Sequence, residues 1–340
     1  MPQRIDINDF FELRKEIPVI DARTPKEFEQ GHIPGAYNIP VMDNEDRVVI
    51  GTLYKQNGKQ PAIMKGLELA GPKLKDFIKA AKKIPNHNNA FIVHCWRGGM
   101  RSGFLSWILE FYGFKIYTLI GGYKAFRRSM LQELEKDKNF IVLGGKTGSG
   151  KTLVLHEISR LGEQVLDLEK IAHHKGSSFG SLGEEKQPSQ EQFENNIAFT
   201  LKFLESAKRI WIEDESRTIG NKVIPAHLWE QLRSSTVVSL EIPQEERLNY
   251  LIRGYSNYPL DQLIDATARI EKRLGPEQTK NALIALRNGD FKEGFKYSLQ
   301  YYDKTYAHGL SKREKEKIKT IHFPTVDPQQ MAAEIIKLKL

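Results

Sequence analysis

Residues 140–152 of the chain read FIVLGGKTGSGKT, and this stretch decides the architecture that we expect around it. An apolar run that fits a buried strand leads into a glycine-rich loop, and residues 151–161 have the spacing of a helix. The loop matches G-x-x-x-x-G-K-[ST], in which backbone N–H groups, a lysine and a hydroxyl bind phosphate. A nucleotide is the default ligand, and any diphosphate satisfies the same chemistry. The predicted phosphate-binding residues are Gly145, Gly148, Ser149, Gly150, Lys151 and Thr152.

Apolar runs alternate with amphipathic stretches on both sides of this loop, which predicts α/β sheets covered on both faces. The expected strands are 18–22, 90–94, 115–120, 140–145, 163–168, 209–213 and 236–242, and the expected helices are 72–83, 102–112, 126–134 and 151–161. After Pro243 the strand signals fade, and the rest looks mostly helical and polar. The predicted organisation is a first domain over 1–134, a charged linker at 133–139, a second α/β core over 139–243 and its mostly helical extension over 244–340.

Length and composition narrow the class of protein. A chain of 340 residues favours two domains, and 40% hydrophobic with 28% charged residues is ordinary globular composition. The sequence shows neither an apolar stretch long enough for a membrane span nor the apolar core of a signal peptide, so we expect a cytoplasmic protein without a membrane partner. One cysteine excludes an intrachain disulfide and a cysteine-based zinc cluster.

Charge is distributed unevenly along the chain. The net charge is +8 overall, +10 over residues 51–138, +6 over 269–340 and −4 in each of the remaining segments, 1–50 and 139–268. Two basic blocks around an acidic middle indicate a polyanionic partner such as nucleic acid, and solvated lysines are the alternative interpretation. The candidate RNA-binding residues are Lys79, Lys82 and Lys83 in the first block and Lys312, Arg313 and Lys315 in the second.

A second glycine-rich loop contains the cysteine. Residues 95–102 read CWRGGMRS, after the apolar run AFIVH and before a helical stretch. Inward-turned N–H groups, the start of a helix and two arginines all favour a thiolate over a thiol. We therefore predict Cys95 as a nucleophile that accepts sulfur, selenium or a phosphoryl group, rather than an inert buried thiol. The expected anion-cradle residues are Arg97, Gly98, Gly99 and Arg101.

Acidic residues follow two of the strands expected beyond the phosphate loop. Three consecutive acidic side chains repel one another unless a cation or a basic partner neutralises them. A metal ion such as Mg²⁺ is therefore compatible with the end of this strand, although the sequence does not identify the ion. An exposed acidic turn is the alternative. The segment 173–180, HHKGSSFG, indicates a loop over the ligand. The candidates are Asp167, Glu169, Glu213, Asp214, Glu215, Ser216, Arg217 and His174.

The stretch from about residue 5 to about residue 130 resembles the rhodanese family. The resemblance rests on DAR at 21–23, EF at 27–28, GHIPGAYNIP at 31–40, the cysteine loop and GGY at 121–123. It implies a rhodanese-like α/β domain whose cysteine carries a persulfide, with an Asp and an Arg of the first motif supporting the fold. Arg101 stands six residues after Cys95 instead of five, and this longer loop also resembles dual-specificity phosphatases. Loop length therefore leaves chalcogen transfer and phosphoryl chemistry open.

The combination of a rhodanese-like domain and a P-loop NTPase-like domain resembles the bacterial tRNA 2-selenouridine synthase family. Further matching pieces are GTLYKQ at 51–56, GGYKA at 121–125, HKGSSFG at 174–180, FEN at 193–195, EDESR at 213–217 and KRLG at 272–275. The resemblance implies that geranyl diphosphate alkylates the sulfur of a wobble 2-thiouridine in tRNAs for Lys, Glu and Gln. Selenium from selenophosphate then replaces the geranylated sulfur. It also implies binding of the tRNA anticodon arm and is compatible with contact with a selenophosphate-supplying enzyme.

Two other classes compete with this interpretation. One is an ATP-dependent P-loop kinase with a regulatory rhodanese-like domain, and the other is a non-catalytic tRNA-binding sulfur carrier. The intact cysteine loop argues against the first class, and the intact phosphate loop with its downstream carboxylates argues against the second. The sequence determines neither the use of ATP nor the residues around the geranyl chain.

Overall fold

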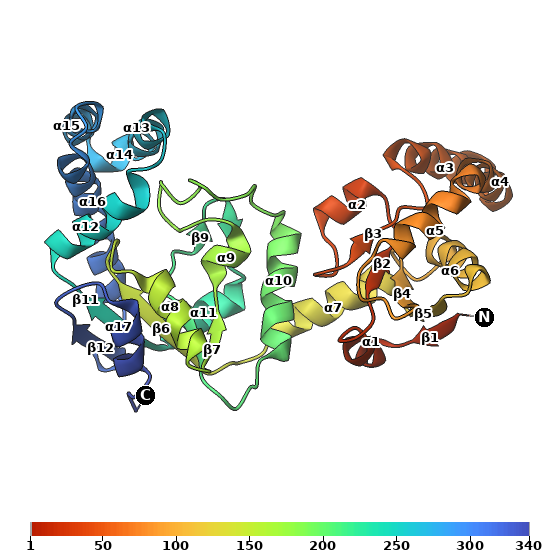
Figure 1. The fold of residues 1–340 in the computed structure, drawn as a ribbon, viewed down its shortest axis with the longest axis horizontal. Helices are drawn as coiled ribbons and strands as arrows, with labels where there is room; N and C mark the ends of the chain where they lie inside the picture. Colours follow the sequence, from red (N-terminus) through yellow and green to blue (C-terminus); the bar gives the residue numbers. More distant parts are fainter. Residues whose placement is uncertain (1, 340) are drawn as a thin grey trace. The chain divides into compact units, whose positions relative to one another are not determined.

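The computed structural model describes residues 2–339, and its contacts divide the chain into two compact units. Unit 1 comprises Met1–Glu133 together with Glu194–Phe199, and unit 2 comprises Leu134–Phe193 and Thr200–Leu340. Each unit contains its own five-stranded parallel sheet (Figure 1). Over the described residues, no helix combines the length and the apolar character that a membrane span requires.

The sheet of unit 1 has the strand order β1-β5-β4-β2-β3, and all of its pairings are parallel. Its middle strand, β4, is buried along its whole length, as parallel strands covered on both faces usually are. Cys95 follows this strand directly. The strands are β1 (Gln3–Ile5), β2 (Val19–Asp21), β3 (Tyr37–Asn38), β4 (Ala90–His94) and β5 (Lys115–Leu119).

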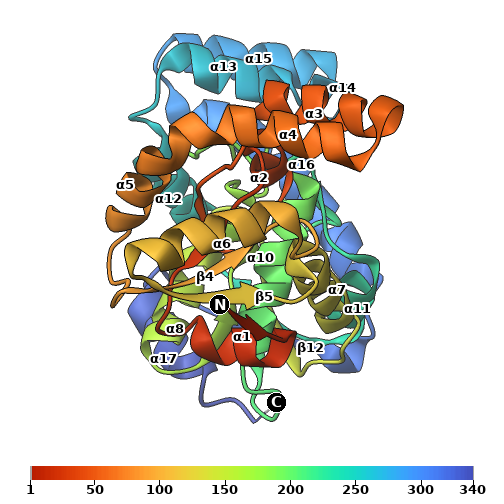
Figure 2. The same cartoon turned by 90° about the vertical axis from the view of Figure 1, so that its right-hand side faces the viewer.

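Helices cover both faces of this sheet. On one face, Phe91 and Val93 of β4 pack with Leu105 and Leu109 of α6, which lies over β4 and β5 in Figure 2. On the other face, aromatic rings of α1 and α7 pack together, and Phe10 meets Phe126 with ring centroids 6.4 Å apart. The helices are α1 (Ile7–Leu13), α2 (Pro25–Gln30), α3 (Asn44–Asn57), α4 (Lys59–Ala70), α5 (Leu74–Lys82), α6 (Met100–Tyr112) and α7 (Gly122–Leu134), with a 3₁₀ turn η1 (Gly71–Lys73).

The sheet of unit 2 has the strand order β12-β11-β6-β8-β7 and is also parallel throughout. Its middle strand, β6, ends in the glycine-rich phosphate loop. A two-stranded antiparallel ribbon of β9 and β10 stands apart from it. The strands are β6 (Phe140–Gly145), β7 (Gln164–Leu166), β8 (Ile210–Glu213), β9 (Thr218–Ile219), β10 (Lys222–Val223), β11 (Thr236–Glu241) and β12 (Ile318–His322).

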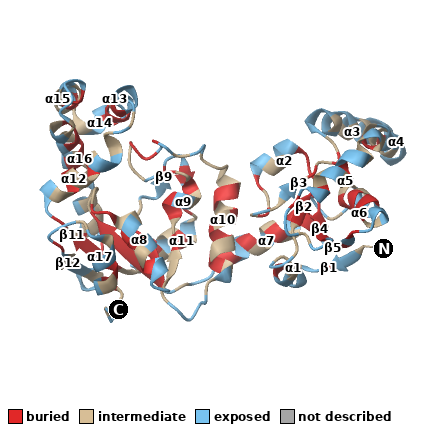
Figure 3. Ribbon diagram, in the orientation of Figure 1, coloured by how far each residue is buried: buried red, intermediate tan, exposed pale blue. Residues whose placement is uncertain are grey.

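The helices of unit 2 form two groups of packed side chains. α8 and α17 bury Val154, Ile158 and Met331 against the sheet, whose strands are largely buried in Figure 3. α12, α13, α15 and α16 enclose a separate apolar core that includes Leu251 and Phe295. The helices are α8 (Lys151–Arg160), α9 (Leu168–Ala172), α11 (Ala226–Ser234), α12 (Gln244–Tyr255), α13 (Leu260–Ala268), α14 (Glu271–Leu274), α15 (Pro276–Arg287), α16 (Phe291–Ser311) and α17 (Pro328–Ile335), with a 3₁₀ turn η2 (Lys315–Lys317). The remaining helix, α10 (Gln190–Phe203), is divided between the units, because its residues 194–199 belong to unit 1.

The predicted fold class is confirmed, with parallel α/β sheets in both units and a mostly helical C-terminal part. The expectation that strands cease after Pro243 is wrong for one element, because β12 pairs along its length with β11. This edge strand, IKTIH, contains no long apolar run, and three of its five residues, the lysine, the threonine and the histidine, are exposed, while its two isoleucines are half-buried. The short edge strands β1 and β3 escaped prediction for the same reason, since an edge strand buries little apolar surface.

Candidate active sites

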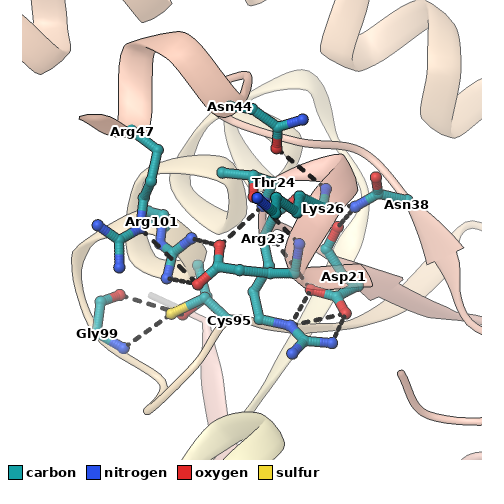
Figure 4. A network of polar contacts seen from close by, with 12 residues as sticks. Asp21, Arg23, Thr24, Lys26, Asn38, Asn44, Arg47, Cys95, Gly99 and Arg101 are labelled. Atoms are coloured by element: carbon teal, nitrogen blue, oxygen red, sulfur yellow. Dashed lines mark hydrogen bonds and ion pairs between the residues drawn. The ribbon is translucent and has the colours of Figure 1, made fainter. Parts of the chain in front are cut away.

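The sulfur of Cys95 lies inside a loop that curls around it between β4 and α6 (Figure 4). The Gly99 N–H donates a hydrogen bond to Sγ over 3.3 Å. The hydroxyl oxygen of Ser102 lies 3.2 Å from Sγ and 3.1 Å from the Gly99 carbonyl oxygen, so its single proton serves either acceptor. Cys95 is buried, with 4% of its surface exposed. The loop therefore offers hydrogen-bond donors to a thiolate, as the sequence predicted.

Opposing effects determine the acidity of this thiol. Burial alone raises the pKa of Cys95, while hydrogen bonds from Ser102 and the Gly99 N–H and the positive charge of Arg101 lower it. The net result is a pKa below the ordinary value for cysteine. A lowered pKa increases the fraction of the nucleophilic thiolate near neutral pH.

Arg101 forms an ion pair with an acidic residue of α2. Its guanidinium donates to both carboxylate oxygens of Glu27 on α2, and Arg47 lies 3.8 Å from the same carboxylate. Burial raises the pKa of Glu27, but the hydrogen bond and charge of Arg101 bring the net pKa below its usual value. An anion in the loop therefore shares Arg101 with Glu27, while Arg97 is exposed. The sequence did not predict the roles of Glu27 and Ser102.

Two glycines allow the turn before α7 to close on the cysteine loop. Gly98 has φ +68°, and a Cβ atom there would lie 2.6 Å from the carbonyl oxygen of Leu119. Gly122 has φ +54°, and a Cβ atom there would lie 2.2 Å from the carbonyl oxygen of Cys95. The Tyr123 N–H donates to that same oxygen over 2.8 Å. Only glycine tolerates both the left-handed backbone and the close approach.

A buried ion pair connects the first motif to this turn. The guanidinium of Arg23 and the carboxylate of Asp21 are both fully buried and lie 2.6 Å apart. Arg23 also donates to the Gly31 carbonyl oxygen over 2.6 Å and lies 3.8 Å from the ring centroid of Tyr123. Neither side chain contacts the sulfur through a hydrogen bond that the structure records. The pair therefore positions the surrounding segments rather than taking part in chemistry.

The phosphate loop of unit 2 has the glycine geometry that the motif predicts. Gly148 and Gly150 have φ +84° and +73°. A Cβ atom at Gly148 would lie 2.7 Å from the Arg247 carbonyl oxygen, so α12 packs directly on the loop. The Lys151 ammonium donates to the Gly145 carbonyl oxygen over 2.9 Å, which keeps its charge over the loop.

Three carboxylates gather beside the start of α8. Oxygen atoms of Glu169, Glu213 and Glu215 all lie within 4.8 Å of one another. The Thr152 hydroxyl donates to Glu169 over 2.9 Å. Glu213 is completely buried, and neither of its oxygens has a hydrogen-bond partner among the described residues. A cation would neutralise this arrangement, so the residues fit an oxygen-liganded ion such as Mg²⁺.

The pKa values of these carboxyl groups agree with that interpretation. Burial and mutual repulsion raise the pKa of Glu213 well above its usual value. Burial raises the pKa of Glu215 to about 8, with a further contribution from the charge of Glu169. Burial also raises the pKa of Glu169, against the opposing charge of Lys151. Three crowded acids with raised pKa values are characteristic of a site that functions with a positive charge.

Other candidates have different positions. Asp214 accepts a hydrogen bond from Arg313 over 2.7 Å, because alternate residues leaving β8 point to opposite sides and only Glu213 and Glu215 face the cluster. Asp167 caps α9 by accepting the Lys170 N–H and pairs with His156. Neither carboxylate belongs to the three-glutamate cluster, although the charge of Asp167 contributes to the raised pKa values of Glu169 and Glu213.

The remaining loop candidates are also outside the cluster. Ser216 and Arg217 are exposed beyond it. His174 is buried, and a Cβ atom at Gly180 would lie 2.7 Å from its ring, so the histidine packs inside its own loop. Burial lowers the pKa of His174, and the charge of Arg269 lowers it further. The Nδ1 atom of His174 is buried and has no hydrogen-bond partner among the described residues.

Comparison with known proteins places this geometry in a family. Residues 138–326 match the model described as "tRNA 2-selenouridine synthase AAA domain", and residues 8–129 match "Rhodanese-like domain". The tRNA 2-selenouridine synthase of Sulfurovum sp. (strain NBC37-1) is 35% identical, over 92% of this chain and 93% of its own length. The chain belongs to the tRNA 2-selenouridine synthase family.

A further curated relative is consistent with this membership. The tRNA 2-selenouridine synthase of Bordetella petrii is 37% identical over 81% of this chain and 72% of its own length. A solved structure titled as the N-terminal domain of an ATP/GTP binding protein from Clostridium difficile 630 is 38% identical, with a TM-score of 0.36. It matches 38% of this chain and 99% of its own length. The membership rests on the family model and on the full-length relatives.

The two predicted basic clusters differ in their exposure. Lys79, Lys82 and Lys83 are exposed at the end of α5. Arg313 is buried, donates to the Leu232 carbonyl oxygen over 2.7 Å and pairs with Asp214, so its assignment to an RNA-binding surface is wrong. The chain around Arg313 also departs from the mostly helical character expected after Pro243, because α16 ends at Ser311, a 3₁₀ turn follows and β12 begins at Ile318. Lys312 and Lys315 remain exposed.

We expect Ser102→Ala to raise the pKa of Cys95, because the thiolate loses a hydrogen-bond donor 3.2 Å away. The midpoint of the rate of iodoacetamide alkylation against pH should rise by about one unit, which corresponds to one charge-assisted hydrogen bond. Ser106→Ala is the matched control, since Ser106 is buried one turn further along α6. Equal midpoints in the two variants would contradict the role assigned to Ser102.

We expect Arg313→Met to lower the free energy of unfolding by about 3 kcal/mol, because the buried Asp214 carboxylate loses its hydrogen-bonded partner and keeps only Arg233, 3.9 Å away. Lys312→Met, which removes the neighbouring exposed charge, should change it by less than about 0.5 kcal/mol. Urea denaturation followed by circular dichroism measures both changes. A similar small effect of the two substitutions would show that the buried pair does not stabilise unit 2.

Proposed function

We propose that this chain converts 2-thiouridine to 2-selenouridine at the wobble position of tRNAs for Lys, Glu and Gln. The observation that supports this most strongly is that both family models match one chain in which the cysteine loop and the phosphate loop are each intact. The proposed reaction has two steps, alkylation of the sulfur by geranyl diphosphate and replacement of the alkylated sulfur by selenium from selenophosphate.

The first step forms a bond between the base sulfur and C1 of the geranyl group and breaks the bond from C1 to the diphosphate oxygen. The negative charge develops on the leaving diphosphate, which needs positive charge and N–H donors. Lys151, the loop N–H groups and the start of α8 supply them in unit 2. Glu169, Glu213, Glu215 and Thr152 would hold a Mg²⁺ ion, which would supply further neutralisation of the diphosphate.

The second step breaks the bond from C2 of the base to sulfur and forms the bond from C2 to selenium, with geranylthiol as the leaving group. Alkylation makes the sulfur a better leaving group, which explains why geranylation comes first. Cys95 contributes a thiolate in a loop of hydrogen-bond donors. In this step the thiolate attacks the phosphorus of selenophosphate and releases hydrogen selenide. Water then hydrolyses the phosphorylated thiol to phosphate and free thiol. This role needs no oxidant.

The tRNA surface that we propose includes the cluster Lys79, Lys82 and Lys83 on α5. Lys82 lies 5.7 Å from the ring centroid of Tyr112, and the neighbouring aromatic side chains of α6 at Trp107 and Phe111 are exposed. Lysines bind the phosphate backbone, and exposed aromatic rings stack on unpaired bases of an anticodon loop. Lys312 and Lys315 form a second, weaker candidate surface, and a selenophosphate-supplying enzyme is a proposed partner of the same pathway.

Two variants test the assignment of the steps. Cys95→Ser should abolish selenation while leaving geranylation within about twofold, because the phosphate loop is untouched. Lys151→Ala should reduce geranylation about a hundredfold, the effect of losing one contact to a developing anion. Lys151→Ala should still selenate tRNA that is already geranylated.

The assay uses thiolated tRNA, geranyl diphosphate and selenophosphate without ATP, and the nucleosides are identified by mass spectrometry. Unreduced 2-selenouridine with Cys95→Ser would remove the thiol from the mechanism. A strict requirement for ATP would favour the kinase class, and binding of tRNA without any product would favour the carrier class.

Replacement of Lys79, Lys82 and Lys83 by alanine should weaken tRNA binding and reduce the slope of log affinity against log salt, because each lost phosphate contact removes slightly less than one unit of slope. The double variant of Lys312 and Lys315 should have a smaller effect. A triple variant of Arg160, Lys170 and Lys208, exposed residues of the acidic middle, controls for net charge. Equal salt slopes for the α5 variant and this control would place the RNA elsewhere.

A further inference from the structure

A short segment of α10 belongs to unit 1, although the chain before and after it belongs to unit 2. This segment comprises residues 194–199, and the sequence motif FEN at 193–195 overlaps its start. Neither the cysteine loop nor the phosphate loop includes this motif. Asn195, its last residue, is completely buried. A buried amide is costly unless its polar atoms are hydrogen-bonded, so the partners of Asn195 indicate what it does.

Both ends of the Asn195 amide have partners in unit 1. Its Oδ1 atom accepts a hydrogen bond from Arg127 of α7 over 2.9 Å. Its Nδ2 atom donates to the hydroxyl oxygen of Tyr123 over 2.8 Å and to the His32 carbonyl oxygen over 3.3 Å. An arginine can only donate, so Arg127 determines which end of the amide carries the oxygen. The amide N–H groups are therefore directed at Tyr123 and His32.

Two further contacts fix the segment in unit 1. Glu194 forms an ion pair with the same Arg127 guanidinium that donates to the amide. Phe199, about one helical turn after Asn195, packs under the guanidinium of Arg14 on the chain after α1, which lies 4.2 Å from the centroid of the ring. The segment is thus held at both of its ends, so the amide between them has a defined position.

Tyr123 connects this amide to the cysteine loop. Its N–H donates to the Cys95 carbonyl oxygen over 2.8 Å, and the next N–H, of Lys124, donates to the Trp96 carbonyl oxygen over 3.0 Å. The centroid of its ring lies 3.8 Å from the guanidinium of Arg23 and 5.7 Å from the centroid of the Trp96 ring. The backbone of Tyr123 therefore holds the cysteine loop, while its hydroxyl is held by α10.

We propose that Asn195 is a positioning residue for Cys95 and acts through the hydroxyl of Tyr123. While that hydroxyl is held, the turn before α7 keeps one position against the backbone of the cysteine loop, and the donors of the loop stay at hydrogen-bond distance from the sulfur. Without the bond the turn is less constrained, and the donors are less well preorganised around a thiolate. The inference rests on the proposed function only in taking Cys95 as the nucleophile of the selenium step.

The test is the pH dependence of iodoacetamide alkylation in the full chain, which has one cysteine. Asn195→Ala and Tyr123→Phe should each raise the midpoint by about half a unit, less than Ser102→Ala because the effect is indirect. The double variant should have the midpoint of either single variant, because both substitutions remove the same hydrogen bond. Rates above the midpoint should equal those of the starting protein. Tyr123→Phe keeps the ring and gives a readout if Asn195→Ala fails to fold.

Asn89→Ala is the matched control, because the Asn89 amide also joins two segments of unit 1, donating to the Gly113 carbonyl oxygen over 2.9 Å, but at the opposite end of β4. It should leave the midpoint unchanged. Unchanged midpoints in the Asn195 and Tyr123 variants, or shifts that add in the double variant, would overturn the positioning role. If the midpoints shift as expected while Cys95→Ser still forms 2-selenouridine at the full rate, the role proposed for the thiol in selenation fails and the positioning of the thiol stands.

Discussion

The middle strand of a parallel sheet, with neighbours on both sides, is the constraint on which both candidate sites depend. β4 and β6 each occupy this position, so the loop after each strand lies at the centre of the carboxyl edge of its sheet. The backbone N–H groups of the following turn, and those of the first turn of the next helix, have no partner within the strand or helix. Each unit uses these groups differently, around a sulfur atom in unit 1 and as a phosphate loop in unit 2.

Neighbouring strands supply the charges that such an edge needs. In unit 2, β8 lies beside β6 in a register that pairs Glu213 with Leu143, just before the phosphate loop. Glu213 and Glu215 face the cluster, and the intervening Asp214 faces Arg313 on the opposite side. A shift of one residue along this strand would exchange the two roles, because strand side chains alternate with a period of two.

The sequence predicted the parts of this structure that depend on local pattern. The central strands, the two loops and the helices after them all have strong apolar periodicity or glycine spacing, and they were placed within about two residues. Contacts between residues far apart in the chain could not be predicted from the sequence. No local pattern connects Arg313 to Asp214, Glu27 to Arg101 or Arg247 to the phosphate loop. The acidic run 213–217 could not be divided into cluster and structural residues until the direction of β8 was known.

The edge strand β12 has a consequence for how unit 2 becomes complete. It pairs with β11 across the whole helical segment of residues 242–317, and α17 after it packs against α8 behind the phosphate loop. Pairing over so long a separation closes a large loop in the chain and is intrinsically slow. During synthesis on the ribosome, the phosphate loop emerges long before the strand and helix that finish its sheet. The edge of β11 and the apolar face of α8 then stay uncovered, so this interval is when unit 2 is most exposed to aggregation.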